Sequence, residues 1–318
     1  MSETRAPKKV ILAEPRGFCA GVRRAIQIVE EALNKYGAPV YVRKEIVHNH
    51  YVVRSLEQRG AIFVDSEEEV PEGSVCVFSA HGVSPAVRTN AAHRELEVID
   101  ATCPLVSKVH QEAIRYARDG KTILLIGHSD HEEVEGTFGE APASTIIVED
   151  VEAVAALDLP SDADVAYLSQ TTLSLDETSG VIDALREKFP ALEGKGDICY
   201  ASQNRQNAVK AIAQRSDLVL VVGSVNSSNS IRMVEVARDL GTASYLVPEV
   251  GDLRTEWLDG VSSVGVSAGA SAPEILIDQL LERLATLGYV DLELELEQTA
   301  IENVVFSLPA SLTGASVR

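Results

Sequence analysis

Short apolar runs and amphipathic stretches alternate along most of this chain. Residues 96–99 form one apolar run, and after the turn 100–104 apolar residues recur at Val109 and Ala113. Short apolar runs bounded by turn residues are typical of buried strands, whereas the second spacing is that of a helix. The turn between them contains Cys103 and then a proline, which suits the first turn of a helix. This pattern predicts a strand, a turn that carries a cysteine, and a helix.

The same construction occurs twice more. The run 10–13 leads into Cys19, and Asp197 and Ile198 lead into Cys199, each with a helical pattern after it. Each copy continues with a strand that ends in a polar turn, and later with a strand that ends in serine and a second polar turn. The first turns are residues 48–50, 128–131 and 224–229, and the second turns are residues 79–84, 169–174 and 267–272. Such regular recurrence indicates an internal repeat.

We therefore predict an α/β fold of three quasi-equivalent small units, here called repeats, in a pseudo-threefold, trefoil-like arrangement. Each repeat should be a parallel sheet with helices on both faces. The predicted repeats are residues 19–102, 103–198 and 199–287. Residues 10–18 hold a strand that we expect to pair with the third repeat.

The ends and the joints of the chain have a different composition. Residues 1–9 are expected to be a disordered leader. Residues 288–318 are expected to be a C-terminal tail without an assigned role. Its residues 292–297 alternate leucine with glutamate and are either an added edge strand or a solvated segment, and disorder is expected from Ser307 onward. Residues 193–196 contain two glycines and have the composition of a linker.

Composition narrows the class of protein. The chain has 318 residues, 45% of them hydrophobic, and a net charge of −20. The apolar content indicates a globular protein, and the acidic surface argues against general binding to nucleic acid or to anionic membranes. No apolar run is long enough for a membrane-spanning helix, and no signal-peptide core follows the polar N-terminus. We expect a cytoplasmic protein, either a monomer or a homodimer.

The three turn cysteines suggest a metal centre. In a pseudo-threefold arrangement Cys19, Cys103 and Cys199 would converge on the axis, and three thiolates bind a soft metal centre. A structural zinc site normally has four ligands in close cysteine pairs, which are absent from the sequence. One [4Fe–4S] cluster per chain with three cysteine ligands fits better, and it leaves one iron open for chemistry. Three unrelated structural cysteines are the alternative, which the equivalent positions disfavour, whereas Cys76 lies within a predicted buried strand and is expected in the core.

The polar turns should surround the same centre. Their candidate binding residues are neutral donors: His48, His81, His131, Thr171, Thr172, Ser227, Ser228, Asn229 and Ser271. Several precede predicted helices, whose N-terminal N–H groups favour anions. Taken singly, each is better explained as a helix cap or turn residue, but their recurrence in all three repeats favours a phosphate or diphosphate site. Neither a Walker loop nor a Gly-x-Gly-x-x-Gly motif is present.

One acid stands beside these donors. Glu133 follows His131 closely and is a candidate proton donor next to the open iron. The alternative is a solvated glutamate at the start of a helix, because acids favour the first helical turn. We expect Glu132 and Glu135 to be solvated acids of that kind.

Together these motifs resemble the 4-hydroxy-3-methylbut-2-enyl diphosphate reductases of the non-mevalonate isoprenoid pathway. The matching stretches lie between residues 10 and 287, and they are residues 16–22, 47–49, 79–84, 100–104, 170–174, 226–229 and 269–273. The chain departs from the family's usual pattern at Glu132, where proline is common, and at Val225, where many members have lysine.

The resemblance implies a three-lobed fold around a [4Fe–4S] cluster ligated by Cys19, Cys103 and Cys199. It implies that the diphosphate is held by His48, His81, Ser227, Ser228, Asn229 and Ser271, and that His131, Thr171 and Glu133 organise protonation. The products would be isopentenyl and dimethylallyl diphosphate, with electrons from a ferredoxin or a flavodoxin. Two alternatives remain open, an aconitase-like iron–sulfur hydro-lyase and a cluster-based sensor without turnover.

Overall fold

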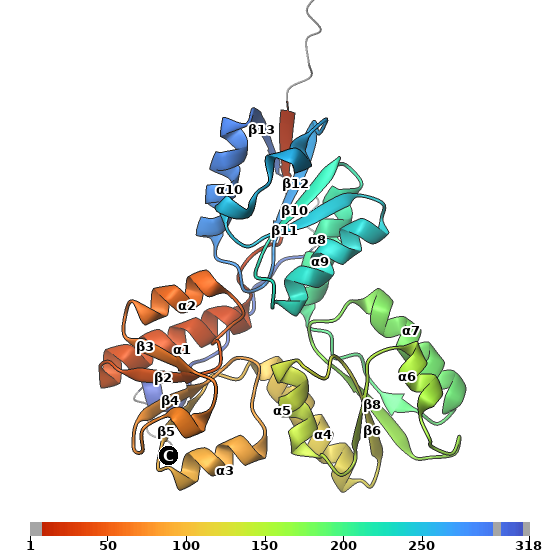
Figure 1. Ribbon diagram of the computed structural model, residues 1–318. Helices are drawn as coiled ribbons and strands as arrows, with labels where there is room; N and C mark the ends of the chain where they lie inside the picture. Colours follow the sequence, from red (N-terminus) through yellow and green to blue (C-terminus); the bar gives the residue numbers. More distant parts are fainter. Residues whose placement is uncertain (1–7, 295–299, 314–318) are drawn as a thin grey trace, which may run out of the picture. The chain divides into compact units, whose positions relative to one another are not determined.

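The computed structural model describes residues 8–294 and 300–313. It contains three sheets, in which every strand pair of the described residues is parallel. The predicted α/β class with three small parallel sheets is therefore confirmed (Figure 1). The chain divides into two compact units. The first unit comprises the described parts of residues 1–19 and 200–304, and the second those of residues 20–199 and 305–318.

The second compact unit contains two four-stranded sheets. One has the order β3-β2-β4-β5, and the other β7-β6-β8-β9. Their strands are β2 (Val40–Arg43), β3 (Ala61–Val64), β4 (Val75–Phe78), β5 (Glu97–Asp100), β6 (Thr122–Ile126), β7 (Thr145–Val148), β8 (Val165–Ser169) and β9 (Glu193–Gly194). Their helices are α1 (Ala20–Tyr36), α2 (His50–Glu57), α3 (Pro85–His93), α4 (Pro104–Arg118), α5 (Glu132–Glu140), α6 (Val151–Ala156), α7 (Leu175–Lys188) and α11 (Ala310–Thr313).

The first compact unit contains one five-stranded sheet of order β11-β10-β12-β1-β13. Its strands are β1 (Lys8–Leu12), β10 (Leu218–Val222), β11 (Ala243–Val247), β12 (Ser263–Ala268) and β13 (Tyr289–Leu294). Helices α8 (Tyr200–Ala213) and α9 (Ser228–Asp239) lie on one face, and α10 (Glu274–Thr286) lies on the other (Figure 1).

The strand that leads to each turn cysteine has the same neighbour in all three sheets. β5 pairs with β4, β9 with β8, and β1 with β12. In each pair the neighbour is the strand that ends in the serine turn. Residues 10–12 thus lie in the sheet of the third repeat although they are far from it in sequence, with Val10 opposite Val264. The quasi-equivalence of the repeats extends to strand order.

Three local features differ from expectation. Lys8 and Lys9 were expected in the leader but lie in β1, whereas residues 1–7 fall outside the described residues. The stretch expected to be a linker contains β9, because Gly194 lets the chain approach β8 closely: a Cβ there would lie 2.4 Å from the ring of Tyr167. In the tail, β13 pairs with β1 at the edge of the sheet, which confirms the edge-strand alternative for residues 292–294, whereas residues 295–297 lie outside the described residues. Ala310–Thr313 forms α11 within the stretch that was expected to be disordered.

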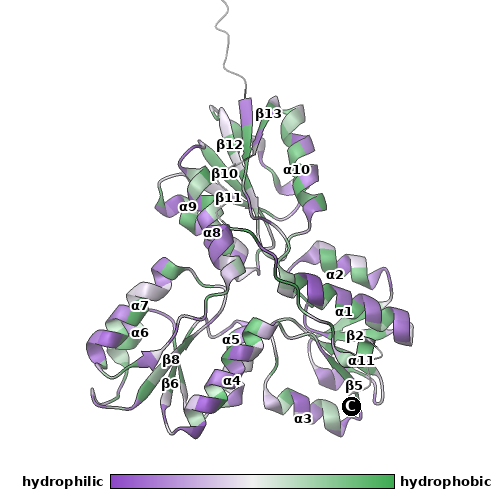
Figure 2. Ribbon diagram, turned by 180° about the vertical axis from the view of Figure 1, so that it is seen from behind, coloured by the Kyte–Doolittle hydropathy of each residue, from purple (hydrophilic) through white to green (hydrophobic). Residues whose placement is uncertain are grey.

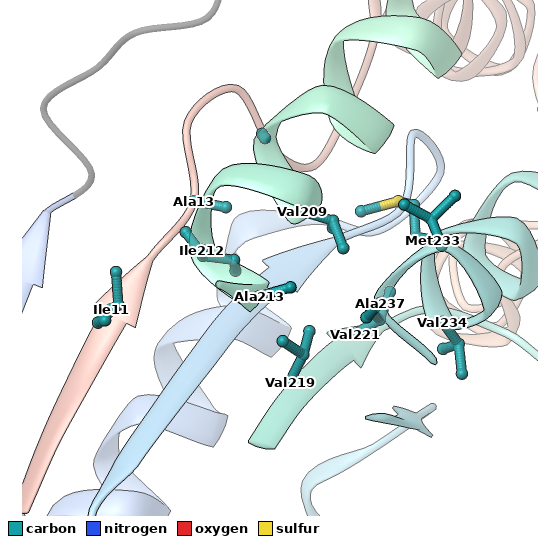
Figure 3. Packing of buried hydrophobic residues seen from close by; sticks show 12 residues of the cluster. Ile11, Ala13, Val209, Ile212, Ala213, Val219, Val221, Met233, Val234 and Ala237 are labelled. Atoms are coloured by element: carbon teal, nitrogen blue, oxygen red, sulfur yellow. The ribbon is translucent and has the colours of Figure 1, made fainter. Parts of the chain in front are cut away.

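Alternate strand residues face opposite helix layers. In β6, Leu124 and Ile126 pack with the cluster under α7, and Ile123 and Leu125 pack with the cluster under α4. Figure 2 shows hydrophobic residues concentrated in the strands and mixed faces on the helices. In the first compact unit, Ile11 of β1 joins the core formed by α8, α9 and β10 (Figure 3). Among the described helices, none combines the length and apolarity needed to cross a membrane.

Candidate functional site

Each turn cysteine is anchored to the serine turn beside it. The backbone N–H of Cys19 donates to the carbonyl of Ala270 at 3.1 Å, within the first compact unit. In the second unit, the N–H of Cys103 donates to Ala80 at 3.0 Å, and that of Cys199 donates to Thr171 at 2.9 Å. All three cysteines are half-buried, and each directly precedes a helix, α1, α4 or α8. The same backbone contact therefore fixes all three in equivalent positions.

The fourth cysteine has a different environment. Cys76 lies in β4 and is wholly buried, and burial raises the pKa of its thiol to about 12. A thiolate, the form that binds metal, is strongly disfavoured there. The cysteines thus fit an iron–sulfur cluster with three cysteine ligands. Three half-buried cysteines directly precede helices, while the fourth packs in the core.

Three histidines meet in the second compact unit. His48 follows β2, His81 follows β4, and His131 caps the start of α5. The rings of His48 and His81 stack with centroids 4.0 Å apart, and His131 meets them edge-on at 5.5 and 5.9 Å. The cluster lies at the carboxyl ends of β2 and β4, which is where open α/β sheets bind ligands. The first and second polar turns of repeat one are thus brought together with the first turn of repeat two.

The histidine cluster is held mainly in the neutral form. Burial and the neighbouring histidines lower the pKa of His131 to about 3. Its Nδ1 accepts a hydrogen bond from the N–H of Glu133 at 3.1 Å, so its proton is carried on Nε2. Burial, followed by the charge of His81, also lowers the pKa of His48. Both of these rings are therefore neutral at pH 7, and each has one N–H to donate. His131 carries it on Nε2, whereas Nδ1 of His48 lies 3.2 Å from the carboxylate of Glu45.

Glu132 corrects one expectation. It was expected to be solvated, but its carboxylate lies 3.0 Å from Nδ1 of His81 and its side chain is 22% exposed. Burial acts to raise the pKa of Glu132, but the hydrogen bond and charge of His81 outweigh it and the pKa is lowered. The ligand atoms of His48, His81 and Glu132 lie within 4.8 Å of one another, a spacing that would also admit a metal ion. The prediction for Glu132 was wrong because it used only the position of the residue at the start of a helix. Its partner, His81, belongs to another repeat.

Glu133 is the buried acid of the site. Its carboxylate accepts the N–H of Thr171 at 2.6 Å and the hydroxyl of Thr171 at 3.0 Å. Burial raises the pKa of Glu133 to about 7 despite these two hydrogen bonds. Glu133 is 3% exposed, whereas Glu135, two residues further along α5, is exposed, as predicted. Thr172, the other threonine of this turn, accepts a hydrogen bond from the side chain of Gln170.

The remaining candidates lie in the first compact unit. Ser227 caps α9, Ser228 is its first residue, and the hydroxyls of Ser227 and Ser271 are 3.5 Å apart. Oδ1 of Asn229 accepts the N–H of Ala270 at 2.7 Å. Nδ2 of Asn229 is buried and has no hydrogen-bond partner among the described residues. A buried amide with an unsatisfied N–H at a helix start suits an anion.

Sequence reasoning missed one residue of this turn. Ser230 is wholly buried, and its hydroxyl donates to Ser227 at 3.0 Å. Gly223 and Gly269 make room for it, because a Cβ on either would lie within 2.2 Å of the Ser230 hydroxyl. The glycines that directly follow β10 and β12 were the available signal, since glycine at both positions indicates that another part of the chain packs closely against the backbone there.

The chain is similar to proteins of known family. Residues 10–285 match the LytB protein family. A curated 4-hydroxy-3-methylbut-2-enyl diphosphate reductase from Leifsonia xyli is 57% identical over 97% of this chain and 92% of its own length. The same named enzyme from Streptomyces coelicolor is 55% identical over 96% of this chain and 90% of its own length.

Two solved structures of reductases are also similar to this chain. The E-1-hydroxy-2-methyl-but-2-enyl-4-diphosphate reductase from Plasmodium falciparum matches with a TM-score of 0.93 at 39% identity, over 96% of this chain and 97% of that one. A structure of (E)-4-hydroxy-3-methyl-but-2-enyl diphosphate reductase matches with a TM-score of 0.63 at 33% identity, over 88% of this chain and 99% of that one. The resemblance inferred from the motifs is confirmed, and the chain belongs to the LytB protein family.

Proposed function

We propose that this protein is a 4-hydroxy-3-methylbut-2-enyl diphosphate reductase. It would convert the allylic alcohol to isopentenyl and dimethylallyl diphosphate, the last step of the non-mevalonate route to isoprenoid precursors. Membership of the LytB family and the names of its relatives support this activity. The structural observation that carries it is the buried Glu133, which is hydrogen-bonded to the turns of His131 and Thr171 and whose pKa of about 7 suits a proton donor.

The proposed cofactor is one [4Fe–4S] cluster per chain, ligated by Cys19, Cys103 and Cys199. The support is the common environment of these three thiols and the burial of the fourth. When bound, a cluster with three protein ligands supplies single electrons and an iron with Lewis-acid character. We propose a ferredoxin or flavodoxin as electron donor, a monomer or homodimer as the working form, and the cytoplasm as its location.

The diphosphate is proposed to bind the polar turns. Its ligands would be His48, His81, His131, Thr171, Thr172, Ser227, Ser228, Asn229 and Ser271. The unsatisfied Nδ2 of Asn229 supports an anion there, and neutral imidazole and hydroxyl donors can bind it without lysine or arginine. Ser230 would orient Ser227 through its hydrogen bond.

The proton chemistry is assigned to Glu133, with Thr171 and His131 as its partners. Replacing an allylic hydroxyl by hydrogen consumes two electrons and two protons and releases water. A carboxyl group with a pKa near 7 is present in both protonation states at neutral pH, so it can give up a proton and regain it. The hydroxyl of Thr171 can donate to the carboxylate and accept from the protonated acid, so it can hold Glu133 in either state. The N–H of Glu133 keeps Nδ1 of His131 as an acceptor, so the ring carries its proton on Nε2, and this N–H would donate to the substrate oxygen.

An anaerobic assay with a reduced dye tests this function against its two alternatives. A reductase oxidises the dye only when the allylic diphosphate is present, and it forms both isomeric diphosphates. A hydro-lyase would convert substrate without oxidising the dye, and a sensor would do neither. Substrate loss without dye oxidation, or no turnover by iron-loaded protein, would refute the proposal.

A further inference from the structure

Arg205 is a buried cation in the first compact unit. It lies on α8 and is 1% exposed. Its Nε and Nη2 donate to the carbonyl of Gly17 at 2.9 and 2.6 Å, and its Nη1 donates to the carbonyl of Ala201 at 2.9 Å. Gly17 lies two residues before Cys19 in the sequence, and Ala201 lies two residues after Cys199. One guanidinium therefore binds the backbone carbonyls of two residues that are close in sequence to two of the three proposed cluster ligands.

The carboxylate that faces Arg205 comes from the C-terminal segment. Glu302 contacts Nη1 at 2.9 Å and Nη2 at 3.3 Å, and its side chain is 16% exposed. Asn204 donates to the same carboxylate at 3.1 Å. Burying a guanidinium costs free energy unless a charge of opposite sign is close to it. Glu302 supplies that negative charge for Arg205. Glu302 lies beyond residues 10–285, which match the family.

The backbone near Cys19 adopts a conformation that favours glycine. Gly17 has φ of +65°, in the left-handed region, and a Cβ there would lie 3.2 Å from the carbonyl of Ala272. The turn thus requires glycine at this position, and the carbonyl of the same residue accepts both hydrogen bonds from Arg205. Arginine suits the task because its planar group donates to several acceptors in fixed directions, which lysine cannot do.

We propose that Arg205 and Glu302 are positioning residues that fix the Cys19 turn and the start of α8, so that the C-terminal segment is needed to retain the cluster. This inference rests on the proposed cluster and not on the identity of the substrate. Glu302 touches neither cysteine and acts through the guanidinium, which in turn acts through the two carbonyls.

The test uses anaerobically purified, iron-loaded full-length protein. The variants are Glu302→Gln, which keeps shape and removes charge, and Arg205→Lys, which keeps charge and removes the fork. The matched control is Glu293→Gln, because Glu293 is also an ion-paired acid of the C-terminal region, with Lys9 and Arg215 as partners, but it is 38% exposed. Iron release to a chelator is followed while iodoacetamide labels the cysteines, which are then quantified one by one by mass spectrometry.

We expect iron release at least several-fold faster in Glu302→Gln and Arg205→Lys, with Glu293→Gln equal to the unmodified protein. Labelling of Cys19 and Cys199 should accelerate most, and that of Cys76 should not change, because β4 remains folded. If Arg205→Lys does not fold, Glu302→Gln decides the question alone. Unchanged release in Glu302→Gln, or an equal acceleration at all four cysteines, would overturn the proposal, since the second result means that Glu302 supports only the fold. Loss of reductase activity plays no part in the test, so failure of the proposed substrate would not be mistaken for failure here.

Discussion

Both carboxylate oxygens of Glu133 accept hydrogen bonds from Thr171, one from its N–H at 2.6 Å and one from its hydroxyl at 3.0 Å. The carbonyl of the same threonine accepts the N–H of Cys199 at 2.9 Å. One residue therefore contacts the buried acid on one side and the backbone of a proposed cluster ligand on the other. The acid is held at a fixed place relative to that cysteine without touching it.

Glu133→Gln should abolish most turnover. The amide keeps the size of the side chain but cannot supply a proton, so kcat should fall by about 10²–10⁴, the usual contribution of general acid–base catalysis. Iron content and substrate affinity should stay near those of the unmodified protein. Glu135→Gln on the same helix is the matched control, because Glu135 is exposed, and it should be close to neutral. A steady-state assay with saturating reduced dye decides, and a Glu133→Gln enzyme with normal kcat would remove Glu133 from the mechanism.

The same residue predicts a dependence of stability on pH. Burial raises the pKa of Glu133 from 4.5 to about 7, so the folded state binds a proton that the unfolded state has released between these values. The stability from this group is complete below about pH 4.5 and is lost as pH rises through 7, a difference of about 3 kcal/mol. The thermal midpoint of the unmodified protein should therefore fall relative to Glu133→Gln between pH 5 and 8. Parallel curves for the two proteins would contradict the raised pKa.

Much of this architecture could be predicted from the pattern of the chain. Equivalent turns at Cys19, Cys103 and Cys199 predicted three parallel sheets because apolar periodicity and turn residues are local signals. β9 could not be predicted, since a two-residue strand carries no periodicity and Gly194 acts through its fit against Tyr167. The quasi-equivalent N–H contacts of the cysteines also needed the strand order.

Long-range polar contacts account for the other differences. Glu132 has the local sequence of a solvated helix-start acid, and only the packing of His81 against it shows otherwise. Arg205 and Glu302 pair across a stretch of sequence in which no motif joins them. Such pairs cannot be predicted from the local pattern of one sequence, because their free energy depends on how far folding buries both groups together.

Asn229→Asp should weaken diphosphate binding while leaving its turn intact. The substitution keeps Oδ1 as an acceptor for the N–H of Ala270 but replaces the unsatisfied Nδ2 by a negative oxygen. Loss of a hydrogen bond to a charged group predicts an affinity lower by roughly 10–150-fold, with added repulsion. Calorimetry with the substrate or with inorganic diphosphate measures it. Equal affinities of the two proteins would place the anion elsewhere.

The cysteines should separate into two kinds. Serine at Cys19, Cys103 or Cys199 should each remove most of the bound iron. Cys76→Ala should keep the iron and cost only packing in β4, of the order of 1 kcal/mol. Iron analysis of the four variants after identical anaerobic purification is the measurement. Iron loss in Cys76→Ala, with retention in one of the other three, would mean that the ligand set has been misassigned.

Three thiolates of this chain are proposed to hold a cluster in which one iron lacks a protein ligand. Iron and acid-labile sulfide analysis with Mössbauer spectroscopy on anaerobically purified protein tests it most directly. We expect about four irons and four sulfides per chain, with one iron distinct from the rest and altered when the allylic diphosphate is added. Zinc in place of iron, a two-iron spectrum, or four equivalent irons that do not respond to the substrate would contradict it.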